Sequence, residues 1–174
     1  VHEHTGFWRH LVLRETSLGE RMAVFYTAPI ASDASAEMEA LAASLPGVDG
    51  VLWYENPRVA DAAIGELKAV LRGRDWVTER LNGLSFKLSP TSFFQTNTKG
   101  AEVLYDVIKR AALKDRPSHI ERETLLDLYC GTGSIGLSLS SDFHSVVGVE
   151  LNEEAVEDAR ANAARNEINT ARFY

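Results

Sequence analysis

The sequence has very little cysteine, no long apolar run and a shortage of basic residues. Its single cysteine, Cys130, rules out a disulfide within the chain and a CxxC zinc site, and it is compatible with a reducing compartment. No stretch is long and apolar enough for a membrane-spanning helix, and the first residues lack a signal-peptide pattern. We therefore expect a soluble, cytoplasmic protein without a membrane partner.

Acidic residues outnumber basic ones. The 25 aspartates and glutamates and the 18 lysines and arginines give a formal net charge of −7 at pH 7. Because phosphate contacts need clustered positive charge, this balance argues against a free-standing nucleic-acid-binding module. Any RNA affinity is expected to be local or to reside elsewhere in the protein. The 174 residues suffice for one domain or two small ones.

The most informative stretch is 125–136. The apolar run 125–129 has the length of a buried strand, and the GxGxxG spacing of Gly131, Gly133 and Gly136 follows at a turn into a helix. Positions without a β-carbon let the backbone approach a ligand, and the unpaired N–H groups that begin a helix favour polar or anionic ligand groups. The pattern is typical of sites for nucleotide-type cofactors.

A second buried strand is expected over 145–150, ending in the carboxylate of Glu150, nineteen residues after Gly131. In a βαβ unit this carboxylate reaches the carboxyl end of the first strand, where it can accept hydrogen bonds from both hydroxyls of an adenosine ribose. The expected ligand therefore contains adenosine. A dinucleotide and S-adenosylmethionine both meet this condition.

Asp127 favours S-adenosylmethionine. A carboxylate inside the first strand can hold an ammonium group or organise the following loop, but it would oppose a nearby pyrophosphate. A competing interpretation is that the glycines only make a tight turn and that Glu150 is a solvated strand end. Cys130 is better explained as a small packing residue than as a nucleophile, since no sequence neighbour is an obvious base.

The first 89 residues predict a small α+β domain. The expected elements are a hairpin of strands 10–14 and 22–26, a helix capped by Ser32 or Asp33 and ended by Pro46-Gly47, a strand over 50–54, and a hairpin of strands 76–81 and 84–88 closed by Asn82-Gly83. The segment 58–73 is predicted as helix or loop, because its apolar residues have helical spacing but Gly65 weakens a helix.

Histidines near the amino terminus do not make a convincing metal site. His2, His4 and His10 have no carboxylate or cysteine partner at ligand spacing. We therefore predict no metal site.

Ser89-Pro90 separates this part from a second domain over 90–174. In the loop that follows, Phe93 and Phe94 can form a wall of a ligand pocket, or they can be core residues of a joining segment. Asn97 or Thr98 caps the next helix. Its apolar stripe comprises Val103, Leu104, Val107, Ile108 and Ala111.

Three motifs follow one another in the second domain. They are Ser92–Asn97, Asp127–Leu137, and Val147–Glu150 with Ala155–Ala163. In this order they resemble the RNA uracil-C5 methyltransferases, which form 5-methyluridine in tRNA and rRNA. The first domain resembles that family less strongly, through Trp8–Leu11 and the Asn82-Gly83 hairpin. The details are closer to the eukaryotic-type tRNA branch, and no cysteine set for an iron–sulfur cluster is present.

The resemblance implies an α/β fold: the first half of an S-adenosylmethionine-dependent methyltransferase Rossmann domain at 90–174, preceded by the small α+β domain at 1–89. It implies that Gln95 reaches over the cofactor, that Tyr129 and Ser134 line the glycine turn, and that Glu150 binds the ribose. Serine has less reach than the Asn or Thr common at position 134 in the family. The implied cofactor-binding set is Gln95, Asp127, Tyr129, Gly131, Gly133, Ser134 and Glu150.

The family chemistry needs residues that this chain lacks. Because uracil C5 is a weak nucleophile, these enzymes add a cysteine thiolate to C6, transfer the methyl group to C5 and remove the C5 proton with a base. The resemblance implies that both groups lie beyond the third strand, in which the chain ends. We therefore predict no catalytic residue here. The parent protein is expected to methylate RNA, with tRNA favoured over rRNA as the substrate. This fragment is expected to be inactive alone.

Two other functions stay open. A nicotinamide-dependent oxidoreductase fits the glycine pattern with Glu150, although Asp127 and the helix before the first strand speak against it. A noncatalytic cofactor-binding module fits an incomplete Rossmann half, whose short parallel sheet would leave an exposed edge and an uncovered apolar surface. The sequence does not indicate an oligomeric state.

Overall fold

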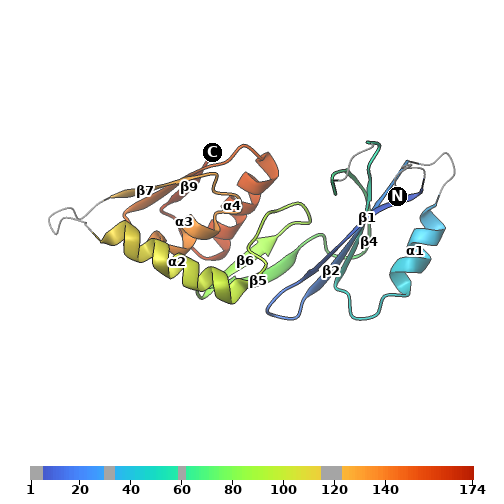
Figure 1. The fold of residues 1–174 in the computed structure, drawn as a ribbon, viewed down its shortest axis with the longest axis horizontal. Coiled ribbons are helices and arrows are strands. Elements are labelled where there is room, and N and C mark those ends of the chain that lie inside the picture. Colours follow the sequence, from blue (N-terminus) through green and yellow to red (C-terminus); the bar gives the residue numbers. More distant parts are fainter. Residues whose placement is uncertain (1–5, 30–33, 59–61, 115–122) are drawn as a thin grey trace. The chain divides into compact units, whose positions relative to one another are not determined.

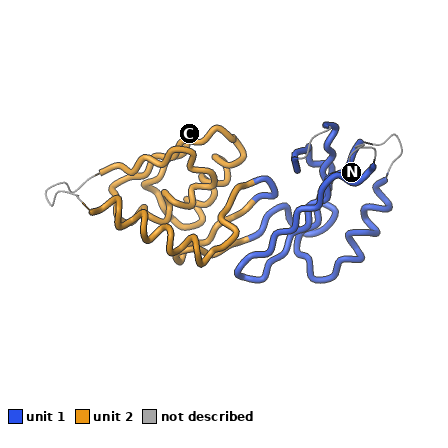
Figure 2. The backbone as a smooth tube through the Cα atoms, in the orientation of Figure 1, with its two compact units in different colours: residues 1–77, 89–91 blue, residues 78–88, 92–174 orange. Residues whose placement is uncertain are grey.

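The computed structural model describes residues 6–29, 34–58, 62–114 and 123–174. These ranges form two compact units, one of residues 1–77 with 89–91 and the other of residues 78–88 with 92–174 (Figure 2). The division differs from the predicted boundary at residue 89, because residues 78–88 belong to the second unit and Ser89–Thr91 to the first.

The first unit contains a four-stranded sheet in the order β1-β2-β3-β4 (Figure 1). Its elements are β1 (Trp8–Glu15), β2 (Arg21–Thr27), α1 (Ser35–Ala43), β3 (Gly50–Glu55) and β4 (Glu66–Gly73). The predicted hairpin is confirmed as the antiparallel pair β1–β2, and β3 lies parallel to β2 after the α1 crossover. The strand predicted over 50–54 is therefore also confirmed.

Helix α1 covers one face of this sheet. Met38 and Ala42 of α1 are buried in a core with Phe25, Val51 and Trp53. The helix begins after Ala34, which supplies no side-chain cap. The predicted capping residues Ser32 and Asp33 lie outside the described residues.

The prediction of helix or loop over 58–73 was wrong, because residues 66–73 form β4. This strand pairs antiparallel with β3. Ala69 and Leu71, two positions apart, pack against the core under α1, so a period of two replaces the helical spacing. A β-carbon at Gly65 would lie 2.5 Å from the Glu55 carbonyl oxygen, so the turn into β4 requires glycine. Pairing with β3 overrides the local preference.

The second unit contains the hairpin of β5 (Val77–Leu81) and β6 (Leu84–Leu88) and a parallel sheet in the order β7-β8-β9. Its other elements are α2 (Thr98–Leu113), β7 (Thr124–Leu128), α3 (Ser134–Ser138), the 3-10 turn η1 (Ser140–Asp142), β8 (Ser145–Val149), α4 (Glu153–Arg165) and β9 (Ala171–Phe173). The hairpin at Asn82-Gly83 and the βαβ order are confirmed, and both turn residues have positive φ. The Rossmann-type α/β fold is therefore present.

Among the described residues, helices cover one face of the parallel sheet. Val146 and Phe173 are buried on the face that α3 and α4 contact, whereas Leu126, Leu128 and Val149 are 57%, 59% and 41% exposed on the other face. Both predicted strands, 125–129 and 145–150, are therefore present, but they are buried on one face rather than as a whole. Parallel sheets usually have both faces covered, and continuous apolar runs are typical of such strands. Here the apolar residues on the second face are not covered by any described residue.

Helix α2 begins as predicted, because the Asn97 side chain accepts a hydrogen bond from Gly100 N. The predicted apolar stripe is not its buried face. Ala101 and Tyr105 are buried, while Val103 and Val107 are 64% and 49% exposed. In the described part of the chain, no helix is long and apolar enough to cross a membrane.

Candidate functional site

The glycine turn joins β7 to α3 at the carboxyl edge of the parallel sheet. Tyr129, Gly131 and Gly133 have φ values of 59°, 54° and 78°. Positive φ is ordinary for glycine but strained for tyrosine. Tyr129 is 88% exposed, so its ring stands in solvent at the carboxyl end of β7. A β-carbon at Gly131 would meet no atom within 4 Å, which leaves open space above the turn.

The Glu150 carboxylate closes this turn from the neighbouring strand. Its Oε2 accepts a hydrogen bond from Gly131 N at 3.0 Å, and its Oε1 accepts from Leu151 N at 2.8 Å and Asn152 N at 3.0 Å. These backbone hydrogen bonds hold the pKa of the Glu150 carboxyl below its usual value, and the hydrogen bond from Asn152 contributes most to this shift. Three of about four acceptor directions are occupied, so Oε2 retains one for a further donor.

Asp127 organises the beginning of α3. Its Oδ2 accepts a hydrogen bond from Gly136 N at 2.9 Å. Burial raises the pKa of the Asp127 carboxyl, and the hydrogen bond from Gly136 opposes that rise. Of the two roles predicted for this carboxylate, loop organisation is the one that this contact supplies.

Ser134, the first residue of α3, contacts α2. Its hydroxyl lies 2.7 Å from the Tyr105 hydroxyl. Desolvation by burial raises the pKa of Tyr105, the hydrogen bond with Ser134 lowers it, and the charge of Asp127 raises it. The Ser134 hydroxyl therefore connects the glycine turn to the helix that precedes β7.

The two phenylalanines of the 92–97 loop differ in burial, so they fit different predicted roles, core residue and pocket wall. Phe94 is buried and its ring centroid lies 5.6 Å from that of Phe86 in β6, so Phe94 is a core residue. Phe93 is 75% exposed, and Gln95 is exposed as well. Of the two phenylalanines, Phe93 is the one available to a ligand in this arrangement, beside the exposed Gln95.

Cys130 is a packing residue, as predicted. Its side chain is buried, and desolvation followed by the charges of Asp127 and Glu150 raises the pKa of the thiol to about 11. A thiol in this state is a poor nucleophile at neutral pH.

Among the described residues, no group of three or more His, Cys, Asp or Glu side chains could hold a metal ion. The His10 ring lies near the Tyr26 ring, at a centroid distance of 6.3 Å. His2 and His4 lie outside the described residues.

Sequence reasoning missed a buried polar group on α4. Asp158 and Asn162 are 2% and 0% exposed, and they contact the 92–97 loop, β6 and the glycine turn. The available signal was two polar residues four positions apart among the alanines of an otherwise apolar helix face.

The profile of the tRNA (uracil-5-)-methyltransferase family matches residues 62–174. The chain belongs to this family. The resemblance found in the three motifs is therefore confirmed.

Two relatives match nearly the whole chain. A mouse protein, tRNA (uracil-5-)-methyltransferase homolog A, is 42% identical over 98% of this chain and 29% of its own length. An uncharacterized RNA methyltransferase of Caldanaerobacter subterraneus subsp. tengcongensis is 40% identical over 98% of this chain and 38% of its own length.

One solved structure shares this fold and is also similar to the chain in sequence. It is the Pyrococcus abyssi tRNA (uracil-54, C5)-methyltransferase in complex with S-adenosyl-L-homocysteine, with a TM-score of 0.78 and 29% identity over 99% of this chain and 40% of that chain. The chain thus spans between 29% and 40% of the lengths of these three proteins.

Proposed function

We propose that this chain is the S-adenosylmethionine-binding part of an RNA uracil-C5 methyltransferase that modifies tRNA in the cytoplasm. Family membership supports the reaction class. The observation that carries the cofactor assignment is the Glu150 carboxylate, which lies against Gly131 N at the carboxyl ends of two adjacent parallel strands. A ligand placed there meets the ionised carboxylate of Glu150 beside the glycine turn.

The residues present fit an adenosine-containing, positively charged cofactor. Space is open above Gly131, and Oε2 of Glu150 retains an acceptor direction for a ribose hydroxyl. Asp127 lies under the turn and would repel a pyrophosphate but attract an ammonium group. We assign cofactor contacts to Gln95, Asp127, Tyr129, Gly131, Gly133, Ser134 and Glu150.

The residues of this chain bind and orient, and none of them performs the chemistry on uracil. Bound S-adenosylmethionine would supply an electrophilic methyl group. Glu150 and the glycine turn would hold its nucleoside, and Tyr129 and Gln95 would cover it from the exposed side. Cys130 is excluded as the uracil nucleophile by its burial and its high pKa. The thiolate and base of the reaction belong to other parts of the protein, which also provide most RNA contacts, since this chain is acidic.

Calorimetric titration with S-adenosylhomocysteine tests the proposal. Glu150→Ala should weaken binding about tenfold to a hundredfold, since removal of a charged hydrogen-bond acceptor costs about 1–3 kcal/mol. Glu157→Ala is the matched control, because Glu157 is an exposed carboxylate of α4 to which no cofactor contact is assigned. Its affinity should equal that of the unmodified chain.

NADH serves as the competing ligand. Binding of NADH without binding of S-adenosylhomocysteine would revive the oxidoreductase alternative. A folded chain that binds neither ligand would favour the noncatalytic alternative for this part of the protein.

A further inference from the structure

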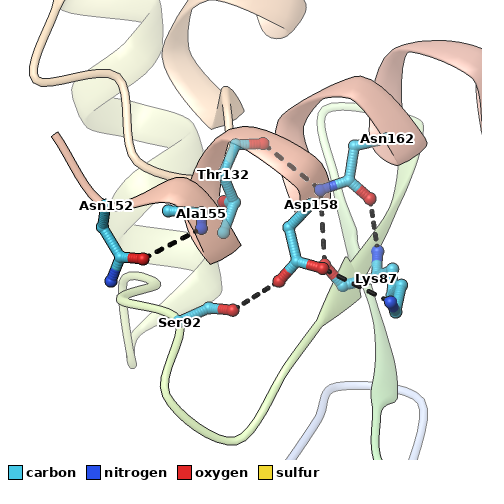
Figure 3. A network of polar contacts seen from close by, with 7 residues as sticks. All are labelled: Lys87, Ser92, Thr132, Asn152, Ala155, Asp158 and Asn162. Atoms are coloured by element: carbon cyan, nitrogen blue, oxygen red, sulfur yellow. Dashed lines mark hydrogen bonds and ion pairs between the residues drawn. The ribbon is translucent and has the colours of Figure 1, made fainter. Parts of the chain in front are cut away.

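Three polar residues, two in α4 and the third its C-cap, contact three separate segments of the second unit. Asp158, Asn162 and Asn166 follow one another at intervals of four residues, so they lie along one face of the helix. Figure 3 shows Asp158 and Asn162 pointing from α4 toward β6, the 92–97 loop and the glycine turn. The face is therefore a common attachment surface for segments that are distant in sequence.

The two asparagines hold the outer edge of β6. Lys87 N donates to Asn162 Oδ1 at 2.6 Å, and Asn162 Nδ2 donates to the Lys87 carbonyl at 3.3 Å. Two residues earlier in β6, Ser85 N and its carbonyl form the same pair of hydrogen bonds with Asn166, both at 2.8 Å. Each side-chain amide thus pairs with the strand as a neighbouring strand would.

Only one of the two asparagines also reaches the glycine turn. Asn162 Nδ2 donates to the Thr132 carbonyl at 3.2 Å, and this contact is buried (Figure 3). Asn166 donates instead to the Asn162 carbonyl within α4. The two residues therefore have the same contact with β6 but differ in their contact with the turn.

Asp158 attaches the 92–97 loop. The Ser92 hydroxyl donates to Asp158 Oδ2 at 2.6 Å, and Lys87 Nζ lies 3.4 Å from Asp158 Oδ1. Ser92 is 4% exposed. A charge-assisted hydrogen bond shielded from water holds the beginning of this loop firmly, three residues before Gln95.

The geometry points to Asn162 and Asp158 as positioning residues of the cofactor site. Asn162 fixes the glycine turn and Asp158 fixes the 92–97 loop, and both act from one rigid helix. Helix α4 thereby sets the distance between the two segments to which cofactor contacts are assigned. This inference rests on the proposed function for its ligand, but its structural part concerns the order of the turn and the loop.

The test compares Asn162→Ala with Asn166→Ala in the 174-residue chain. Both variants lose an equivalent pair of hydrogen bonds to β6, and Asn162→Ala also loses the buried contact with the Thr132 carbonyl, so urea unfolding should show a larger loss of stability for Asn162→Ala. Asn162→Ala should weaken S-adenosylhomocysteine about tenfold, whereas Asn166→Ala should stay within about threefold of the unmodified chain. Equal affinities of the two variants would overturn the inference, since two residues that only hold β6 would be expected to show no difference.

Hydrogen exchange separates this inference from the proposed function. The amides of Gly133 and Gly136, which donate to the Cys130 carbonyl and to Asp127, should exchange faster in Asn162→Ala and not in Asn166→Ala. This readout needs no ligand. If the unmodified chain binds no S-adenosylhomocysteine, the proposed function fails, and unchanged exchange in Asn162→Ala would separately overturn the positioning role.

Ser92→Ala provides a milder variant that does not touch α4. It should speed exchange over residues 93–97 and weaken S-adenosylhomocysteine, while leaving Gly133 protected. If Asn162→Ala does not fold, this variant decides: unchanged exchange in the loop with unchanged affinity would overturn the inference.

Discussion

Because Gly148 in β8 has no side chain, the Cys130 side chain can occupy the space beside it. A β-carbon built at position 148 would lie 2.8 Å from Cys130 Sγ, and it would also overlap the Phe173 ring. The glycine turn of β7 and the middle of β8 are therefore packed together without spare volume. This relationship explains why Cys130 is small and inert, and it leads to two predictions.

Gly148→Ala should destabilise the chain by about 1–3 kcal/mol, the usual cost of forcing an extra methyl group into a packed core. Urea unfolding measures the difference. Gly6→Ala is the control, because a β-carbon there would meet its nearest neighbour, the Trp8 carbonyl oxygen, at 3.8 Å, and should change stability by less than about 0.5 kcal/mol. Equal stability of Gly148→Ala and the unmodified chain would contradict the packing described for Cys130.

Alkylation of Cys130 by iodoacetamide should be slow while the chain is folded. A pKa of about 11 leaves on the order of 0.1% thiolate at pH 8, and the buried position further restricts access. The same chain in concentrated urea should react at the rate of an ordinary thiol. Mass spectrometry follows the adduct, and comparable rates in the folded and unfolded chain would show that the thiol is accessible.

The two carboxylates of the site should affect stability in opposite directions. Burial raises the folded-state pKa of Asp127, so its ionised form opposes folding above that pKa. Backbone hydrogen bonds lower the folded-state pKa of Glu150, so its ionised form favours folding above its unfolded value of about 4.3. At pH 7 we expect Asp127→Asn to stabilise the chain by less than about 1 kcal/mol, given partial solvation, and Glu150→Gln to destabilise it.

Both differences should shrink as the pH falls. The gain from Asp127→Asn diminishes as Asp127 is protonated through its raised pKa, and the loss from Glu150→Gln diminishes below about pH 4, as the pH falls through the lowered pKa of Glu150. Urea unfolding at pH 7, pH 4 and pH 3 measures both, the lowest pH being the one that tests Glu150→Gln. A destabilising Asp127→Asn at pH 7 would mean that the Asp127 charge is compensated.

Thr132→Val should leave stability unchanged or raise it by about 1 kcal/mol. Thr132 is 1% exposed, and within the described part of the chain its hydroxyl oxygen has no hydrogen-bond partner. Removing an unsatisfied buried hydroxyl while keeping the shape carries no hydrogen-bond cost. Ser92→Ala, which removes a charged hydrogen bond, should cost about 1–3 kcal/mol by comparison. A Thr132→Val loss as large as that of Ser92→Ala would reveal a partner, such as a buried water.

The sequence by itself determined the elements whose cause is local. The Asn82-Gly83 hairpin, the Asn97 cap, the glycine turn and the spacing from Gly131 to Glu150 each depend on residues whose backbone preferences or βαβ geometry leave little choice. For the same reason the motifs were sufficient to indicate the family.

The tertiary structure decided what depends on partners distant in sequence. Residues 66–73 form a strand because they pair antiparallel with β3, and the hydrogen bonds of this pairing outweigh the helix preference that the apolar spacing suggested. The exposure of Leu126 and Leu128 depends on which face α3 and α4 cover, and the role of Asn162 depends on β6 and Thr132 meeting the same face of α4. Composition and periodicity describe one segment at a time, and these contacts exist only once separate segments are packed together.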